Sequence, residues 1–182
     1  MRQLLLKRLK NQKGLTLIEL LAVIVILGII AAIAVPAIGG IIDNSKRDAH
    51  AANAIQMINA AKLAVVGDSE ARPANGQSTY LSLGWLVAQG YLEEVRDPDG
   101  TEDNYEPGSD GIVNVAHDDE PTVTDSGYTT GSHVRITAIN NQMTYEVFTF
   151  NGDRGARAEA DSDGTEVDDY VAELEVNRGN VK

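Results

Sequence analysis

The chain has 182 residues, 43% of them hydrophobic, and a formal net charge of −12 from 15 basic and 27 acidic side chains. This length suits one globular domain with an appendage and is too short for two large domains. The sequence has no cysteine, which excludes a disulfide framework, a thiolate metal site and a cysteine nucleophile. The acidity makes the bulk surface a poor match for nucleic acid, whose phosphates attract basic patches.

The first 14 residues differ sharply in charge from the rest of the chain. Residues 1–14 hold five basic side chains and no acid, which leaves 10 basic and 27 acidic side chains, a charge of −17, for residues 15–182. We therefore predict a separate basic leader over residues 1–14. Its charges are Arg2, Lys7, Arg8, Lys10 and Lys13.

A long apolar run follows the leader. Glu19 is the only ionisable side chain in residues 15–42. After it, residues 20–42 form 23 consecutive uncharged positions. As a helix these 23 residues rise roughly 35 Å, enough to cross a hydrocarbon core about 30 Å thick. The basic residues in front predict a cytoplasmic N-terminus and an external C-terminal part. A secretory signal peptide is disfavoured, because its apolar region is only about 7–15 residues long.

The apolar run continues as an amphipathic segment over residues 43–66. No proline interrupts residues 37–66, so one helix is expected to extend from the membrane span to Gly67-Asp68-Ser69, which indicates its end. We expect one helical stripe to face the rest of the protein. Its predicted members are Ala51, Ala54, Ile55, Ile58, Ala61, Leu63, Val65 and Val66.

Residues 67–182 are predicted to form a globular head. A short helix is expected over residues 82–92, then a turn at Asp97-Pro98-Asp99-Gly100 and a strand over 111–116. Alternating apolar residues on both sides of Asn140-Asn141 predict a β-hairpin, since asparagine tolerates positive φ. The tail from Ala156 is acidic and weakly patterned. The fold class is therefore α+β, with a long N-terminal helix packed on a small C-terminal antiparallel sheet.

The segment Lys13-Gly14-Leu15-Thr16-Leu17-Ile18-Glu19-Leu20-Leu21 resembles the N-terminal motif of type IV prepilins. In that family a short basic leader ends in glycine directly before the apolar helix, and a glutamate follows at the fifth mature position. This sequence departs from the pattern at Leu15, where phenylalanine is commoner. The resemblance covers about residues 7–66.

The resemblance implies processing and assembly by a dedicated machinery. A prepilin peptidase would cut between Gly14 and Leu15 and then N-methylate Leu15, so that the mature chain keeps its membrane anchor. Glu19 would pair with the new α-amine of a neighbouring subunit during assembly and so set the axial register. An alternative is that Glu19 lies in the membrane interface and snorkels towards water.

Pro36 interrupts the helical pattern, and Gly28, Gly39 and Gly40 lie near it. Proline in a helix removes one hydrogen bond and clashes with the preceding turn, which predicts a kink. Similarity to pilins implies that Pro36, Gly39 and Gly40 mark a segment that loses helical structure in the filament. The alternative is simple tolerance, because glycine and proline are commoner in membrane helices.

The head gives weaker indications. The run from Trp85 to Leu92, with Asp97-Pro98 and Tyr105 after it, faintly resembles major pseudopilins and Gram-positive competence pilins. Trp85 and Leu86 are expected to pack in the core. The missing cysteine pair and the missing C-terminal pattern of secretion pseudopilins favour a pilin of Gram-positive style.

Two acidic stretches form a candidate calcium site, because calcium takes six to eight oxygen ligands. Neither stretch has the twelve-residue EF-hand spacing, and the alternatives are solvated acidic loops or adaptation to a saline habitat. No other cofactor is expected. The candidate ligands are Asp97, Asp99, Asp103, Asp161 and Asp163.

Nothing in the sequence indicates catalysis. His50, His117 and His133 are scattered without metal-ligand spacing and are expected to be structural or exposed. We therefore expect no enzyme. The resemblance to type IV prepilins implies a structural subunit, a major pilin, held in the cytoplasmic membrane before assembly and in an extracellular filament afterwards. Two alternatives stay open: a pseudopilin of a secretion machine and a membrane-anchored binding module that does not polymerise.

The resemblance also implies the partners of such a subunit. They are copies of the chain itself, the prepilin peptidase, an assembly platform protein and an ATPase that acts indirectly. The sequence does not distinguish adhesion, motility and DNA uptake as the purpose of a filament. Direct nucleic-acid binding by the main surface is not expected at a charge of −17 for residues 15–182.

Overall fold

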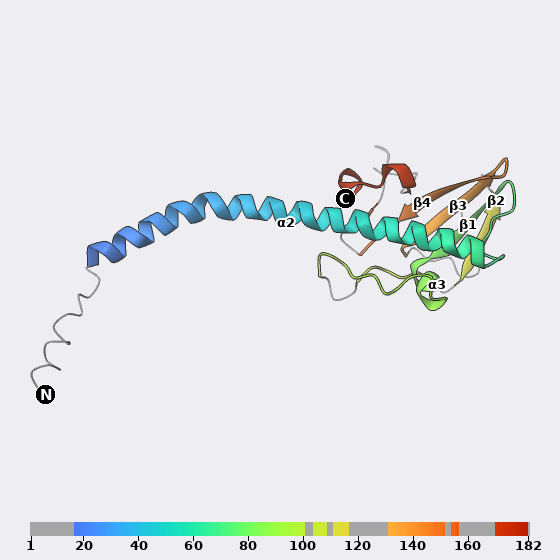
Figure 1. Ribbon diagram of the computed structural model, residues 1–182, viewed down its shortest axis with the longest axis horizontal. Coiled ribbons are helices and arrows are strands. Elements are labelled where there is room, and N and C mark those ends of the chain that lie inside the picture. Colours follow the sequence, from blue (N-terminus) through green and yellow to red (C-terminus); the bar gives the residue numbers. More distant parts are fainter. Residues whose placement is uncertain are drawn as a thin grey trace, which may run out of the picture. The chain divides into compact units, whose positions relative to one another are not determined.

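The computed structural model describes residues 17–100, 104–108, 111–116, 131–151, 154–156 and 170–181. They form one long helix, a five-stranded sheet and three short helical turns (Figure 1). In chain order the elements are α2 (Leu17–Gly67), β1 (Gln77–Ser82), α3 (Leu83–Ala88), β2 (Ile112–Ala116), β3 (His133–Ile139), β4 (Gln142–Phe148), β5 (Val171–Ala172), η1 (Glu173–Glu175) and η2 (Arg178–Asn180).

The predicted α+β class is confirmed. The chain divides into two units, Met1–Asp43 and Asn44–Lys182. The first unit contains the apolar part of α2, and the second contains the rest of α2 together with the sheet. The finer predicted boundaries, with a leader over 1–14, a membrane segment over 15–42, an amphipathic segment over 43–66 and a head over 67–182, stay predictions.

All neighbouring strands of the sheet are antiparallel, in the order β2-β1-β3-β4-β5. The predicted hairpin is confirmed: β3 and β4 pair, and Asn140 and Asn141 between them have φ of 51° and 62°. These left-handed values are typical of the two-residue turns that match the twist of a hairpin. The strand predicted over 111–116 is observed as β2.

The helix predicted over 82–92 is shorter in the structure. Ser82 closes β1 and caps α3, since its Oγ accepts a hydrogen bond from the backbone N–H of Trp85 at 3.0 Å. Gly90, with φ of 75°, ends the turn after α3. Trp85 and Leu86 are buried in the core, as predicted.

The head part of α2 packs on one face of the sheet, and Ala51, Ala54, Ile58, Ala61 and Val65 of the predicted stripe are buried as expected. The buried side chains of this part of α2 are mostly alanines, and Met57 and Ile58 are the large ones. Ile55, Leu63 and Val66 were wrongly assigned to this stripe, because they are 41%, 63% and 86% exposed. At 100° per residue Leu63 lies opposite the centre of Ala54, Ile58 and Ala61, whereas Ile55 and Val66 lie on the flank, roughly 90–115° away from that centre. Small side chains allow the helix to approach the sheet closely.

Alternation along the strands fills both faces of the sheet. Leu81, Val134, Ile136 and Val147 belong to the core cluster that includes α2. The neighbouring positions carry polar and aromatic side chains, among them His133, which is 5% exposed. The last described residues are held to α2 by Arg47, which donates to the carbonyl of Val181 at 2.9 Å, and by a two-pronged ion pair between Arg178 and Asp48.

Candidate functional site

The apolar part of α2 is the first candidate for function. By length and composition, α2 is the one helix among the described residues that is able to cross a membrane, and its most apolar stretch has no buried residue. Large aliphatic side chains of this part, such as Ile33 and Val35, are exposed on every side of the helix. A water-soluble fold does not leave such a surface uncovered, so this stretch is built to contact lipid or other apolar helices.

Glu19 lies in the first turn of α2. Glu19 is the one acidic side chain of the apolar stretch, and no other side chain of residues 17–42 carries a charge. Gly14 and Leu15, between which cleavage is predicted, lie outside the described residues.

Pro36 lies inside α2, and Gly39 and Gly40 are helical as well. A Cβ added at Gly39 or Gly40 would meet nothing within 4 Å. Close packing within the described chain therefore gives no reason for glycine at these two positions. The predicted role of this segment in the filament stays a prediction.

The N-terminal region matches a known family model. The model is described as the prokaryotic N-terminal methylation motif, and it matches residues 9–35. The chain carries a type IV pilin-like prepilin signal. The match includes the end of the basic leader, Gly14, Glu19 and most of the apolar stretch, on which the resemblance was based.

The prepilin signal and the fold point in the same direction. Comparisons with curated proteins and with solved structures returned no match. The prepilin signal supports a pilin-like or pseudopilin-like protein, a structural class, and the long helix with an antiparallel sheet matches the pilin fold. The exposed apolar part of α2 is able to serve as the membrane anchor of such a protein.

The second candidate site lies in the head, where α2 meets the loop after α3. His50 of α2 is fully buried, and its Nε2 lies 3.0 Å from Oδ2 of Asp99 and 3.7 Å from Oδ1 of Asp97. The predicted turn at residues 97–100 is observed: Asp97 Oδ1 accepts the N–H of Asp99 at 3.0 Å, and Gly100 has φ of 74°. The tight turn presents both carboxylates to the helix.

Other polar groups complete this cluster. The hydroxyl of Tyr105 lies 2.6 Å from Nδ1 of His50 and accepts a hydrogen bond from the Asn53 amide at 3.2 Å. Lys46 and Arg154 lie 3.3 Å and 3.6 Å from Oδ1 of Asp99. Burial alone would raise the pKa of Asp99, but hydrogen bonds from His50 and Lys46 and the charge of Arg154 hold it below its usual value.

Two members of this cluster, Asp97 and Asp99, are among the candidate calcium ligands, which stay a prediction. His50, expected to be structural or exposed, is buried and hydrogen-bonded. Its position beside the two aspartates was not predicted, although Lys46, His50 and Asn53 are polar residues spaced to continue the buried stripe of α2. The remaining predicted ligands, Asp103, Asp161 and Asp163, lie outside the described residues, as does His117.

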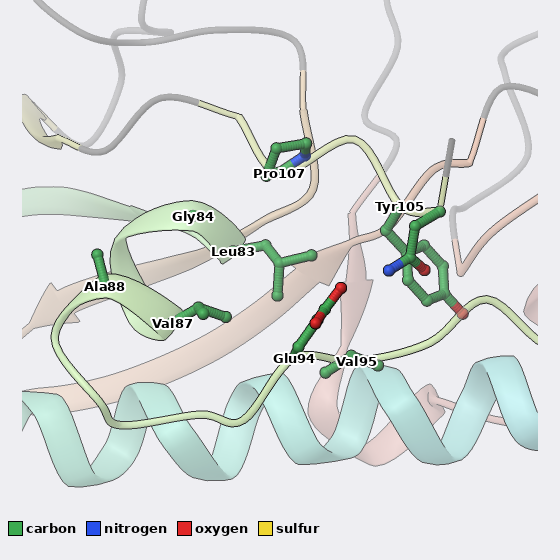
Figure 2. Close-up of a pocket in the computed structure, with 9 residues that line it drawn as sticks. Leu83, Gly84, Val87, Ala88, Glu94, Val95, Tyr105 and Pro107 are labelled. Carbon is green, nitrogen blue, oxygen red and sulfur yellow. The ribbon is translucent and has the colours of Figure 1, made fainter. Parts of the chain in front are cut away.

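A cavity of about 420 Å³ lies beside α3 (Figure 2). Its walls are mostly apolar, and the side chain of Glu94 extends into the space between Leu83 and Tyr105. The described residues that line it supply one carboxylate and no histidine, lysine or arginine, so they form no recognisable catalytic arrangement. The lining residues are Leu83, Gly84, Val87, Ala88, Glu94, Val95, Asn104, Tyr105 and Pro107.

His133, also buried, belongs to the face of the sheet opposite α2. His133 Nδ1 lies 2.5 Å from the carbonyl of Gly131, which only accepts hydrogen bonds, so Nδ1 carries the proton. Nε2 then accepts from the hydroxyl of Tyr170 at 2.8 Å. Burial, aided by the charge of Arg135, lowers the pKa of His133 to about 4. His133 is thus a neutral structural side chain.

Proposed function

We propose that the chain is a structural subunit of a type IV pilus, a major pilin, that is cut after Gly14, N-methylated at Leu15 and polymerised through α2. The observation that carries the proposal is the methylation motif over residues 9–35, whose residues 17–35 belong to a helix with an apolar stretch that is uncovered on all sides. The subunit waits in the cytoplasmic membrane and then enters an extracellular filament. Its partners are the prepilin peptidase, a platform protein, an indirectly acting ATPase and further copies of itself.

Glu19 gives the assembly step its specificity. A carboxylate near the centre of a membrane costs about 2.5–3.5 kcal/mol, so it gains from a cationic partner. Cleavage after Gly14 would create an α-amine with an ordinary pKa of about 7.7–8.0, which stays basic after methylation. Pairing of this amine with Glu19 of a neighbouring subunit fixes how far one helix is shifted along the next. Pro36, Gly39 and Gly40 mark the segment where the helix loosens during packing.

The outward side of α2 in the head supports polymerisation as well. Ile55, Leu63 and Val66 are exposed and lie on one side of the helix, away from the sheet. Exposed aliphatic residues on one helix face are typical of a surface that another protein covers. In a filament, this face extends the apolar contacts of residues 17–42 into the head region.

Mass spectrometry of the purified native protein tests the proposed processing. The expected mature chain begins at Leu15 and carries one additional methyl group on its α-nitrogen. Gly14→Val is the matched variant, because a branched side chain beside the scissile bond should block cleavage and leave the leader attached. An intact leader on the wild-type protein would contradict the proposal and favour a membrane-anchored module that does not polymerise.

Electron microscopy of the cell surface separates a pilin from a pseudopilin. The proposal predicts long fibres that contain this chain as their main component. Processed and methylated subunits without surface fibres would instead indicate a pseudopilin of a secretion machine.

A further inference from the structure

His50, Asp97 and Asp99 form a group of three possible metal ligands within the described part of the head. We propose that these three side chains bind a divalent transition-metal ion of the zinc class. One ligand atom from each residue lies within 4.8 Å of the other two. The ligands come from two separate elements, the helix α2 and the turn at residues 97–100, so the ion would hold the two together.

The distances fit an ion of this size. Zinc binds histidine nitrogen and carboxylate oxygen at about 2.0–2.2 Å, which places two ligands of a tetrahedral site about 3.4 Å apart. Nε2 of His50 lies 3.0 Å from Oδ2 of Asp99 and 3.7 Å from Oδ1 of Asp97. The two distances bracket the tetrahedral value, so small side-chain movements suffice, and a fourth position is left for water.

The surroundings of His50 suit a metal ligand. Its side chain is fully buried, and the Asp97 side chain is 1% exposed. A ligating histidine is usually oriented by a hydrogen bond from its other nitrogen, and here the Tyr105 hydroxyl lies 2.6 Å from Nδ1. Without metal, Nε2–H donates to the Asp99 carboxylate at 3.0 Å. A metal ion on Nε2 would take the place of this proton, and the ring proton would then lie on Nδ1 and be donated to the Tyr105 hydroxyl.

The donor set selects the class of ion. Calcium prefers six to eight oxygen ligands, whereas a buried imidazole nitrogen with two carboxylates is typical of zinc and its neighbours. The inference therefore differs from the calcium site suggested by the acidic sequence, because His50 changes the chemistry of Asp97 and Asp99. It does not depend on the chain being a pilin.

Two basic side chains limit the affinity. Lys46 and Arg154 approach Oδ1 of Asp99, the oxygen that does not face His50. Their side chains are 36% and 26% exposed, so they are able to stay on Oδ1 or to move into water. Their positive charges repel a metal ion at Asp99, so removing one of these side chains should tighten metal binding.

The test uses the full-length chain in detergent micelles after treatment with a chelator. Titration with Zn2+ is followed by calorimetry, and titration with Co2+ by its visible absorption, which intensifies in a tetrahedral site. We expect one ion per chain and a higher thermal unfolding midpoint. His50→Gln should weaken binding at least tenfold, Lys46→Gln should strengthen it, and Asp48→Asn, which removes a carboxylate from the same helix outside the cluster, should leave it unchanged.

If His50→Gln does not fold, the nitrogen-15 NMR spectrum of the wild-type protein tests the same ligand. Zn2+ should shift the Nε2 resonance of His50 in a nitrogen-15 spectrum and leave that of His133 in place. The proposal is overturned if the wild type binds no stoichiometric Zn2+ or Co2+, if the His50 resonance does not move, or if Lys46→Gln binds no more tightly. A midpoint raised by Ca2+ and not by Zn2+ also overturns it.

Discussion

The hydroxyl of Tyr105 lies 2.6 Å from Nδ1 of His50, although the two residues are 55 positions apart. The same hydroxyl accepts a hydrogen bond from Asn53, and the two rings meet edge to face with centroids 5.6 Å apart. Burial raises the pKa of Tyr105, so this hydroxyl stays protonated throughout the ordinary pH range. One phenol thus joins the helix α2 to the segment that precedes β2.

Tyr105→Phe should therefore destabilise the head. It keeps the ring but leaves a buried nitrogen of His50 and the Asn53 amide without this partner, at a cost of about 1–3 kcal/mol. The free energy of unfolding, measured with a chelator present, checks this value. Tyr145→Phe is the matched control, because Tyr145 is partly exposed and its hydroxyl donates only a weak hydrogen bond, to the Met143 sulfur at 3.8 Å, within the described residues. This variant should change stability by less than about 0.5 kcal/mol. Equal effects of the two variants would contradict the role of Tyr105.

The two sides of α2 in the head should respond differently to truncation. Ile58→Ala opens a cavity against the sheet, since Ile58 is fully buried, and should cost about 2–5 kcal/mol. Leu63→Ala removes a similar side chain from the exposed side and should change the stability of the isolated subunit by less than about 0.5 kcal/mol. Chemical denaturation of both variants measures the difference. A larger loss for Leu63→Ala would contradict the assignment of the buried face.

His133 should make the head less stable in weak acid. Its pKa is about 4 in the folded chain and about 6.5 when unfolded, so the unfolded state binds the proton first. The contribution is complete above pH 6.5 and is lost as the pH falls towards 4, on the order of 3 kcal/mol in total. Free energies of unfolding at pH 7, 6 and 5 should therefore fall more steeply for the wild type than for His133→Gln. Parallel pH profiles would show that His133 is not held neutral.

The turn between β3 and β4 should tolerate glycine and reject branched residues. Asn141 has φ of 62°, which a β-branched side chain adopts only with strain. Asn141→Gly should leave stability nearly unchanged, whereas Asn141→Val should cost about 1–3 kcal/mol. Thermal and chemical unfolding of the pair measures this. A valine variant as stable as the glycine variant would contradict the observed turn geometry.

Much of the architecture follows from local sequence signals. The long apolar helix, its end at Gly67 and the hairpin at Asn140-Asn141 each depend on residues close together in the chain, so the pattern is sufficient to predict them. The prepilin signal is likewise a continuous motif.

The parts that were missed depend on tertiary context. β1 reads QSTYLS, a largely polar strand that is stabilised by pairing with β2 and β3 on both sides. Ile55, Leu63 and Val66 have the side-chain type of core residues but are exposed. They are exposed because the sheet packs against the face of α2 that carries the buried alanines, which the sequence pattern alone does not show. The position of His50 opposite Asp97 and Asp99 likewise depends on the path of the loop after α3, which periodicity does not give.

The central claim is that Glu19 directs the assembly of subunits through α2. The most direct measurement compares the amount of shed filament from cells that produce the wild type, Glu19→Ala or the control Asp43→Asn at equal membrane levels. The proposed pairing would offset part of the cost of placing a carboxylate in the membrane, which is about 2.5–3.5 kcal/mol at the membrane centre. We therefore predict normal cleavage after Gly14 but at least tenfold less filament for Glu19→Ala, and wild-type amounts for Asp43→Asn. Wild-type amounts of filament from Glu19→Ala would contradict the account.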